Sequence, residues 1–142
     1  RVEYYRELLH SLGLGLEDKL HVPVSSLSGG QRQAMALLMA TLTPIEFLIL
    51  DEHTAALDPK TAAKVLELTE KIVAEQKLTA MMVTHNMKDA IAMGNRLIMM
   101  NAGRVVVDVR GEEKKKLTRE DLMQLFEKAA GQEIANDRML LS

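Results

Sequence analysis

The apolar run at 47–50, Phe-Leu-Ile-Leu, most constrains the fold of this chain, because it ends directly at two acidic residues, Asp51 and Glu52. An apolar run without alternation is typical of a strand that is buried on both faces. A second run of this kind, at 79–84, follows a segment of helical periodicity that begins at Pro59, with Asp58 before it as the helix cap. Strand, helix and strand in this order predict an α/β fold with a parallel sheet.

Apolar spacings of three and four residues, together with stop signals, predict further helices. We expect them at 1–12, ending at Gly13, at 31–42, at 90–93, closed by Gly94, and at 118–130, ended by Gly131. The segments 97–100 and 105–109 predict two strands joined by a hairpin-like turn, in which Gly103 takes a positive φ. The mixed charges at 112–116 predict a solvated turn.

Composition excludes several classes of protein. Apolar residues make up 47% of the chain and charged residues 27%, which is typical of a globular domain. A net charge of −2 argues against a dedicated polyanion-binding surface, and 3% aromatic residues provide no stacking platform for single-stranded nucleic acid. The chain has no cysteine, so it forms neither disulfides nor Cys-ligated metal sites.

Two features concern the ends and the solubility of the chain. No apolar stretch approaches the roughly 18 residues of a membrane span, and no signal peptide opens the sequence, so we expect a soluble protein. The chain starts at Arg1 without a Met and is already periodic at Val2. We therefore expect it to be a fragment of a longer polypeptide.

The first candidate site is Ser28-Gly29-Gly30-Gln31 at the start of a predicted helix. Two glycines let the backbone approach a ligand closely, and the amides of a first helical turn lack intrahelical partners. The positive end of the helix dipole also favours an anion, so a phosphate fits this segment. The alternative is that Ser28 only caps the helix and that the glycines only form a loop.

The second candidate site lies where the two predicted strands end. Asp51 suits a hydrated Mg²⁺, the adjacent Glu52 suits the polarisation of an attacking water, and His85 suits donation to a phosphate oxygen. Ligands of open parallel sheets bind beyond the carboxyl ends of strands, where these residues fall. The alternatives are an exposed acidic turn and an ordinary surface histidine.

In this order, the motifs resemble those of the ATP-binding cassette (ABC) ATPases. The resemblance covers about residues 24–103 and rests on Ser-Gly-Gly-Gln before a helix, the apolar strand with Asp-Glu, Ala56-Leu57-Asp58, and the strand followed by His85. It implies a partial P-loop NTPase (ABC ATPase) fold, α/β, with a parallel sheet core and part of the helical subdomain, lacking the N-terminal phosphate-loop half. It also implies three regions: 1–43, part of the helical signature subdomain with the signature helix; 44–117, the C-terminal part of the RecA-like ATPase core; and 118–142, a C-terminal helix and tail.

The resemblance also implies a role for each matching residue. Segment 27–31 is the ABC signature, in which Ser28, Gly29 and Gly30 contact the γ-phosphate of an ATP held by the opposing subunit, with Gln31 beside them. Asp51 is the Walker B acid that coordinates Mg²⁺ through water, and Glu52 is the general base. Residues 55–58 match the D-loop, so Asp58 is counted with the nucleotide-binding residues, and His85 matches the switch histidine.

The sequence also departs from the family pattern. His53 stands where Pro is common, which predicts a more flexible strand end; Ala55 replaces a frequent Ser, and Met39 a frequent Arg. The phosphate-cradling sequence G-x-x-x-x-G-K-[ST] is absent from these 142 residues. We therefore expect this chain alone neither to hold ATP tightly nor to hydrolyse it.

The function implied is ATP binding and hydrolysis as the energy-coupling subunit of an ABC membrane transporter, an importer, with ATP and Mg²⁺ as cofactors. The implied partners are a transmembrane permease subunit, a second ATPase subunit in a homodimer and, indirectly, a substrate-binding protein, with no nucleic acid. The implied location is the cytoplasmic face of the membrane, as a peripheral subunit. The sequence at 53–60, 84–87 and 95–100 looks like that of ATPases of bacterial amino-acid importers, including a tryptophan/tyrosine-like group. The alternative is a non-transport ABC-type ATPase or regulatory module associated with nucleic acid or translation.

Overall fold

The computed structural model describes residues 1–141, with only the backbone for Glu133, and the chain divides into two compact units. The first unit is Arg1–Val83, and the second begins at Thr84. This division falls inside the region 44–117 that was expected to form one part of an ATPase core. The three regions inferred from the resemblance stay a prediction, and the end of the predicted tail, Ser142, lies outside the described residues.

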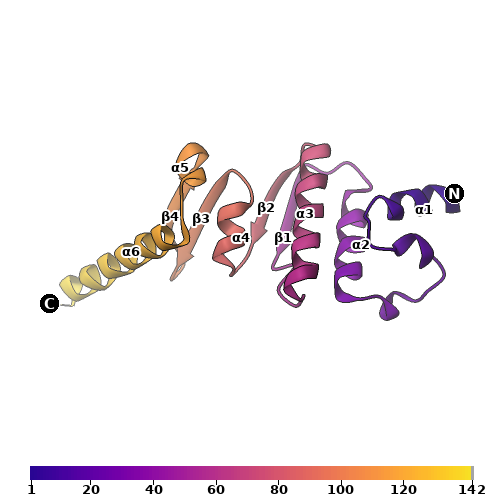
Figure 1. Cartoon of the computed structure of the whole chain (residues 1–142). Helices are drawn as coiled ribbons and strands as arrows, with labels where there is room; N and C mark the ends of the chain where they lie inside the picture. The colour runs from indigo at the N-terminus through magenta and orange to yellow at the C-terminus, as the bar shows by residue number, and fades with distance from the viewer. Residues whose placement is uncertain (142) are drawn as a thin grey trace. The chain divides into compact units, whose positions relative to one another are not determined.

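The first unit packs helices against a two-stranded parallel sheet (Figure 1). Its elements are α1 (Val2–His10), η1 (Leu16–Asp18), η2 (Val24–Ser26), α2 (Gly29–Thr41), β1 (Phe47–Asp51), α3 (Pro59–Glu75) and β2 (Thr79–Val83). β1 and β2 pair in parallel, with Leu50 opposite Met82 and Asp51 opposite Val83. The parallel β-α-β arrangement predicted from the two apolar runs is confirmed.

Helices cover one face of this sheet. Leu48 and Leu50 are buried in a cluster with α2 and α3 residues that include Leu37, Leu68 and Ile72. The alternate side chains of β1, Phe47 and Ile49, are 50% and 58% exposed. The prediction that β1 is buried on both faces is therefore wrong for the described residues, because α2 and α3 pack against only one side of the strand.

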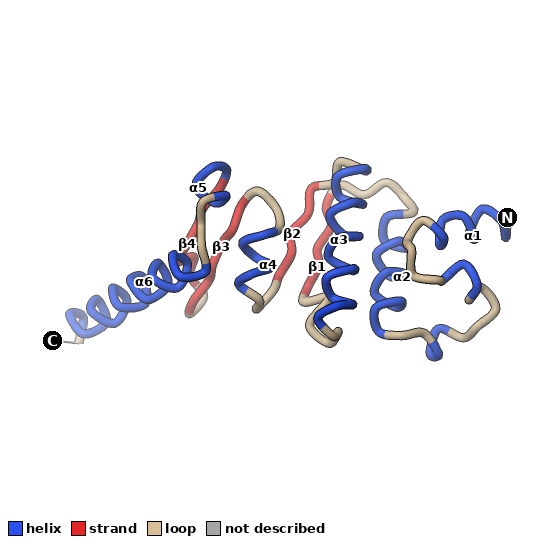
Figure 2. The backbone as a smooth tube through the Cα atoms, in the orientation of Figure 1, coloured by secondary structure: helices blue, strands red, loops and turns tan. Residues whose placement is uncertain are grey.

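The second unit is built on an antiparallel hairpin. Its elements are α4 (Met87–Ala92), β3 (Arg96–Asn101), β4 (Arg104–Arg110), α5 (Gly111–Lys115) and α6 (Arg119–Leu140), shown as helices and strands in Figure 2. Ala102 and Gly103 form the turn with φ of 48° and 76°, which confirms the predicted hairpin and its glycine. Leu122 of α6 is fully buried against Leu97, Val107 and Val109 of the hairpin.

Helix α6 is longer than predicted. Thr118 caps it through a capping box with Asp121, and the helix continues through Gly131 to Leu140. One glycine inside a helix costs only about 1 kcal/mol relative to Ala. The residues that follow Gly131 include good helix formers such as Gln132 and Ala135. The expected stop at Gly131 is therefore wrong.

Lys114 is buried, although the charge run at 112–116 predicted a solvated turn. Its side chain is 3% exposed, and Nζ donates to the carbonyl oxygens of Ile91 at 2.6 Å, Met93 at 3.0 Å and Gly94 at 3.1 Å. Burial lowers the pKa of Lys114, while the three carbonyl oxygens favour the charged ammonium. The lysine thus satisfies carbonyl groups at the carboxyl end of α4. Across residues 1–141, no helix combines the length and apolarity that a membrane crossing requires.

We predict that Lys114→Met destabilises the chain by about 1–3 kcal/mol, because an apolar side chain of similar length leaves the carbonyl oxygens of Ile91, Met93 and Gly94 without this donor. Urea unfolding followed by circular dichroism measures the change. Lys116→Met is the matched control, because Lys116 is exposed two residues along the chain. Equal midpoints for the two variants would contradict the capping role.

Candidate functional site

Ser28 begins α2 with a reciprocal pair of hydrogen bonds. Ser28 Oγ accepts from the Gln31 backbone N–H at 3.1 Å, and Gln31 Oε1 accepts from the Ser28 backbone N–H at 3.0 Å. This capping box involves neither the Gly29 N–H nor the Gly30 N–H, and the Ser28 hydroxyl keeps its own proton for donation. These three donors at the positive end of a 13-residue helix are of the kind that bind phosphate oxygens.

The Gln31 side chain also holds the segment that precedes the helix. Its Nε2 donates to the Leu14 carbonyl oxygen at 3.1 Å, while its Oε1 takes part in the capping box. One side chain therefore ties the loop at Leu14 to the first turn of α2. The capping box and the bond to Leu14 use one lone pair of Gln31 Oε1 and one amide hydrogen, which leaves the side chain one lone pair and one hydrogen for a ligand.

Packing inside the first unit leaves no room for a side chain at Gly30 without a shift of Thr61, and little room at Gly29. A Cβ atom on Gly30 would overlap the Thr61 side-chain methyl, and one on Gly29 would lie 3.0 Å from Leu57 Cδ2. The start of α2 therefore rests on the turn that leads into α3. The sequence suggested ligand approach or a plain loop as the reason for the glycines, because Thr61 becomes their neighbour only when the chain folds.

Asp58 is the N-cap of α3, three residues before Thr61. Its Oδ2 accepts from the Thr61 backbone N–H at 3.1 Å, and hydrogen bonding from the Thr61 side chain and backbone lowers the pKa of Asp58. Thr61 thus connects the two predicted motifs, since it caps with Asp58 and packs against Gly30. The structure brings the signature segment and the end of the D-loop into one contact region.

Asp51 and Glu52 lie where β1 ends. Asp51 belongs to the alternating set of exposed β1 positions, on the face that α2 and α3 leave uncovered. Glu52 has a φ of 50°, which is uncommon for a residue other than glycine. Two backbone bonds hold it: its N–H donates to the Val83 carbonyl oxygen at 2.9 Å, and its carbonyl oxygen accepts from the Ala55 N–H at 3.1 Å. Strain of this kind clusters at functional sites.

His85 belongs to the second unit, close to the start of that unit at Thr84. It is exposed, and it lies in a capped turn before α4: Thr84 Oγ1 accepts from the Asn86 N–H at 3.0 Å, and Asn86 Oδ1 accepts from the Asp89 N–H at 3.2 Å. The structure therefore fixes the local backbone around His85. A role for His85 beside Glu52 stays a prediction.

The single carboxylate of Asp51 fits Mg²⁺ only if the phosphates of a nucleotide and water supply the other ligands. Among the described residues, no three His, Cys, Asp or Glu side chains are placed to hold a metal ion. Mg²⁺ commonly takes one or two carboxylates and completes its octahedron with water and substrate phosphates. One strand-end carboxylate is consistent with that kind of binding and not with an all-protein metal site.

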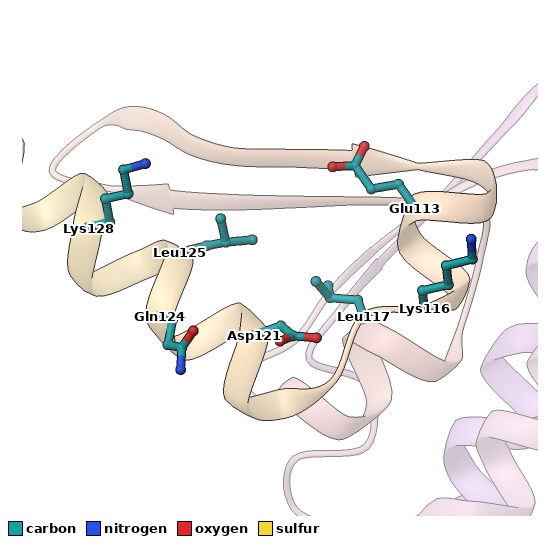
Figure 3. Close-up of a pocket in the computed structure, with 7 residues that line it drawn as sticks. All are labelled: Glu113, Lys116, Leu117, Asp121, Gln124, Leu125 and Lys128. Atoms are coloured by element: carbon teal, nitrogen blue, oxygen red, sulfur yellow. The ribbon is translucent and has the colours of Figure 1, made fainter.

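An open groove lies in the second unit between segment 113–117 and the first turns of α6 (Figure 3). Leu117 and Leu125 line it together with charged and polar side chains from both segments. None of the residues predicted for the candidate site lines this groove. We assign it no part in the proposed chemistry.

Comparison with known proteins gives the family. The model of the ABC transporter family matches residues 3–55. The chain is 52% identical over 122 residues to the tyrosine transport ATP-binding protein of Clostridioides difficile, an alignment that covers 86% of the chain and 49% of the relative. The chain belongs to the ABC transporter ATP-binding proteins.

Other ABC proteins agree with this assignment. The aliphatic sulfonates import ATP-binding protein SsuB of Burkholderia thailandensis is 38% identical over 67% of the chain and 28% of its own length. The methionine import ATP-binding protein MetN 2 of Bacillus cereus is 39% identical over 66% of the chain and 27% of its own length. A solved metal-chelate type ABC transporter in an inward-facing conformation matches with a TM-score of 0.69 and 30% identity, over 88% of this chain and 48% of that chain. The partial ABC ATPase fold expected from the motifs is confirmed.

The chain spans about half the length of the tyrosine transport relative and about half of the matched transporter chain. The matched relatives are named as ATP-binding proteins. The comparisons do not assign individual site residues, so the roles of Ser28, Asp51, Glu52 and His85 rest on the sequence motifs and on the local geometry described above.

We predict that Gly30→Ala lowers the free energy of unfolding by about 1–3 kcal/mol, because the new methyl group overpacks against Thr61. Adding Thr61→Ser restores most of this loss, since serine removes the methyl but keeps the hydroxyl next to Asp58. Urea unfolding of the two single variants and the double variant measures the coupling.

Gly131→Ala is the control for helix propensity. Gly131 lies inside α6 with nothing within 4 Å of the added Cβ, so this variant gains up to about 1 kcal/mol. Additive effects of Gly30→Ala and Thr61→Ser would contradict the contact.

Proposed function

We propose that this chain is the part of an ABC ATPase that contacts the nucleotide of a second copy and supplies the catalytic base. The whole ATPase would serve as the energy-coupling subunit of a membrane importer. The observation that carries the proposal is the capped start of α2, where the Gly29 and Gly30 N–H groups and the Ser28 hydroxyl lie at the positive end of the helix. The import relatives support the assignment to transport.

The proposed chemistry assigns one task to each group. Ser28, Gly29 and Gly30 donate hydrogen bonds to the γ-phosphate of the nucleotide held by the second copy and offset its negative charge. Glu52 accepts a proton from water while the water oxygen bonds to the γ-phosphorus and the bond to the β–γ bridging oxygen breaks, which releases ADP and phosphate. His85 donates to a γ-phosphate oxygen. Mg²⁺, held at Asp51 through water, would supply charge neutralisation for the phosphates.

The proposed partners follow from the same assignment. A second copy of the ATPase supplies the nucleotide, a transmembrane permease subunit receives the conformational change, and a substrate-binding protein acts indirectly. The proposed location is the cytoplasmic face of the membrane, where the permease is reached. The identity of 52% to a tyrosine transport protein favours an amino acid, of the tyrosine or tryptophan type, as the imported substrate.

We predict that Glu52→Gln lowers ATP turnover by at least ~10²-fold and leaves ATP binding intact, because the amide cannot accept the proton of the attacking water. The test uses a polypeptide in which an intact phosphate-loop half of an ABC ATPase domain precedes these 142 residues, with phosphate release as the measurement. Glu46→Gln is the control, since Glu46 is an exposed acid just before β1.

Unchanged turnover in Glu52→Gln would remove Glu52 from the role of base. Stimulation of the parent turnover by a co-purifying permease subunit supports the transport assignment. Co-purification with ribosomes or nucleic acid in place of a permease would overturn it in favour of a non-transport ABC protein.

A further inference from the structure

His53 is anchored to α3 by its side chain. The imidazole is half-buried, and Nε2 lies 3.1 Å from Thr69 Oγ1, whose residue is only 2% exposed. The sequence predicted a more flexible strand end at this position, because His53 replaces a residue whose ring fixes its own φ. The structure instead shows the backbone after β1 tethered through a side chain to a helix that begins six residues later.

The direction of this hydrogen bond follows from the partners of Thr69. Thr69 Oγ1 donates its single proton to the Val65 carbonyl oxygen at 2.8 Å, so towards His53 it offers lone pairs only. His53 Nε2 must therefore carry the proton of this contact.

The anchored residue directly follows Glu52. Glu52 holds an uncommon φ of 50°, and its backbone is bonded on one side to Val83 of β2 and on the other to Ala55 of the turn. Those two bonds define a turn at 52–55, but they do not restrain the side chain of His53. The bond between His53 and Thr69 ties this turn to α3, a third element of the same unit.

We propose that His53, held by Thr69, is a positioning residue that keeps Glu52 in its left-handed backbone conformation and so aims the Glu52 carboxylate at the attacking water. The inference rests on the proposed function of Glu52 as the base. It assigns His53 no contact with the nucleotide. The bond to α3 replaces, by a side-chain anchor, the restraint that a proline ring would give.

The first experiment measures the anchor in the 142-residue chain itself. Thr69→Val keeps the shape of the side chain but removes the acceptor, and His53→Leu removes the donor; Thr69→Ser and His53→Gln keep an acceptor and a donor. Amide hydrogen exchange followed by NMR reports on the Glu52 N–H, which is bonded to Val83. We expect about tenfold faster exchange at Glu52 in Thr69→Val and in His53→Leu, as for the loss of one hydrogen bond, and the parent rate in the two conservative variants.

The second experiment measures turnover in the polypeptide that also carries a phosphate-loop half. We expect Thr69→Val and His53→Leu to lower kcat about tenfold with KM for MgATP unchanged, because the water loses an aligned base while nucleotide binding is retained. The double variant falls no further than either single variant, since both remove the same bond. Thr69→Ser and His53→Gln keep the parent kcat.

The outcomes separate this proposal from the function on which it rests. Unchanged turnover in Glu52→Gln removes Glu52 as the base, whatever the anchor does. Loss of turnover in Glu52→Gln together with equal kcat for Thr69→Val and Thr69→Ser overturns the positioning role alone. Equal exchange at Glu52 in Thr69→Val and Thr69→Ser also overturns it. Should Thr69→Val fail to fold, the comparison of His53→Leu with His53→Gln decides in the same way.

Discussion

The close approach of α2 and α3 at Gly30 is the contact on which the arrangement of the first unit depends. Thr61 fills the space where a Cβ atom would lie, and the same residue donates its backbone N–H to Asp58, the cap of α3. The N–H groups at the start of α2, the proposed phosphate donors, are therefore positioned by the first turn of the next helix. This contact joins the predicted signature to the end of the predicted D-loop within one chain.

The end of β1 adds a second constraint. Parallel pairing with β2 sets Asp51 opposite Val83, and the chain then turns through Glu52 in a left-handed conformation. The strain is held by backbone bonds to Val83 and Ala55 and by the imidazole of His53 against Thr69. Together the two constraints hold the proposed phosphate donors and the proposed base at the ends of elements of one unit.

Local signals in the sequence predicted the strands, the helix starts and the site motifs. Pro59 after Asp58 and the apolar run before Asp51 each depend on a few neighbouring residues, and the structure has the predicted helix and the predicted strand at these places, although one face of the strand is exposed. Features that depend on distant residues were missed, including the burial of Lys114 under the end of α4 and the contact of Gly30 with Thr61. Gly131 misled for the opposite reason, because a local stop signal was overruled by good helix formers on both sides.

The most direct test of the central claim is the molar mass, by light scattering, of Glu52→Gln in a polypeptide with an intact phosphate-loop half, with and without MgATP. The account predicts a monomer that becomes a dimer on addition of MgATP, because Ser28, Gly29 and Gly30 bind the nucleotide of a second copy. Adding Ser28→Glu should abolish the dimer, since a carboxylate there repels the γ-phosphate. A protein that binds MgATP and remains a monomer would contradict the account.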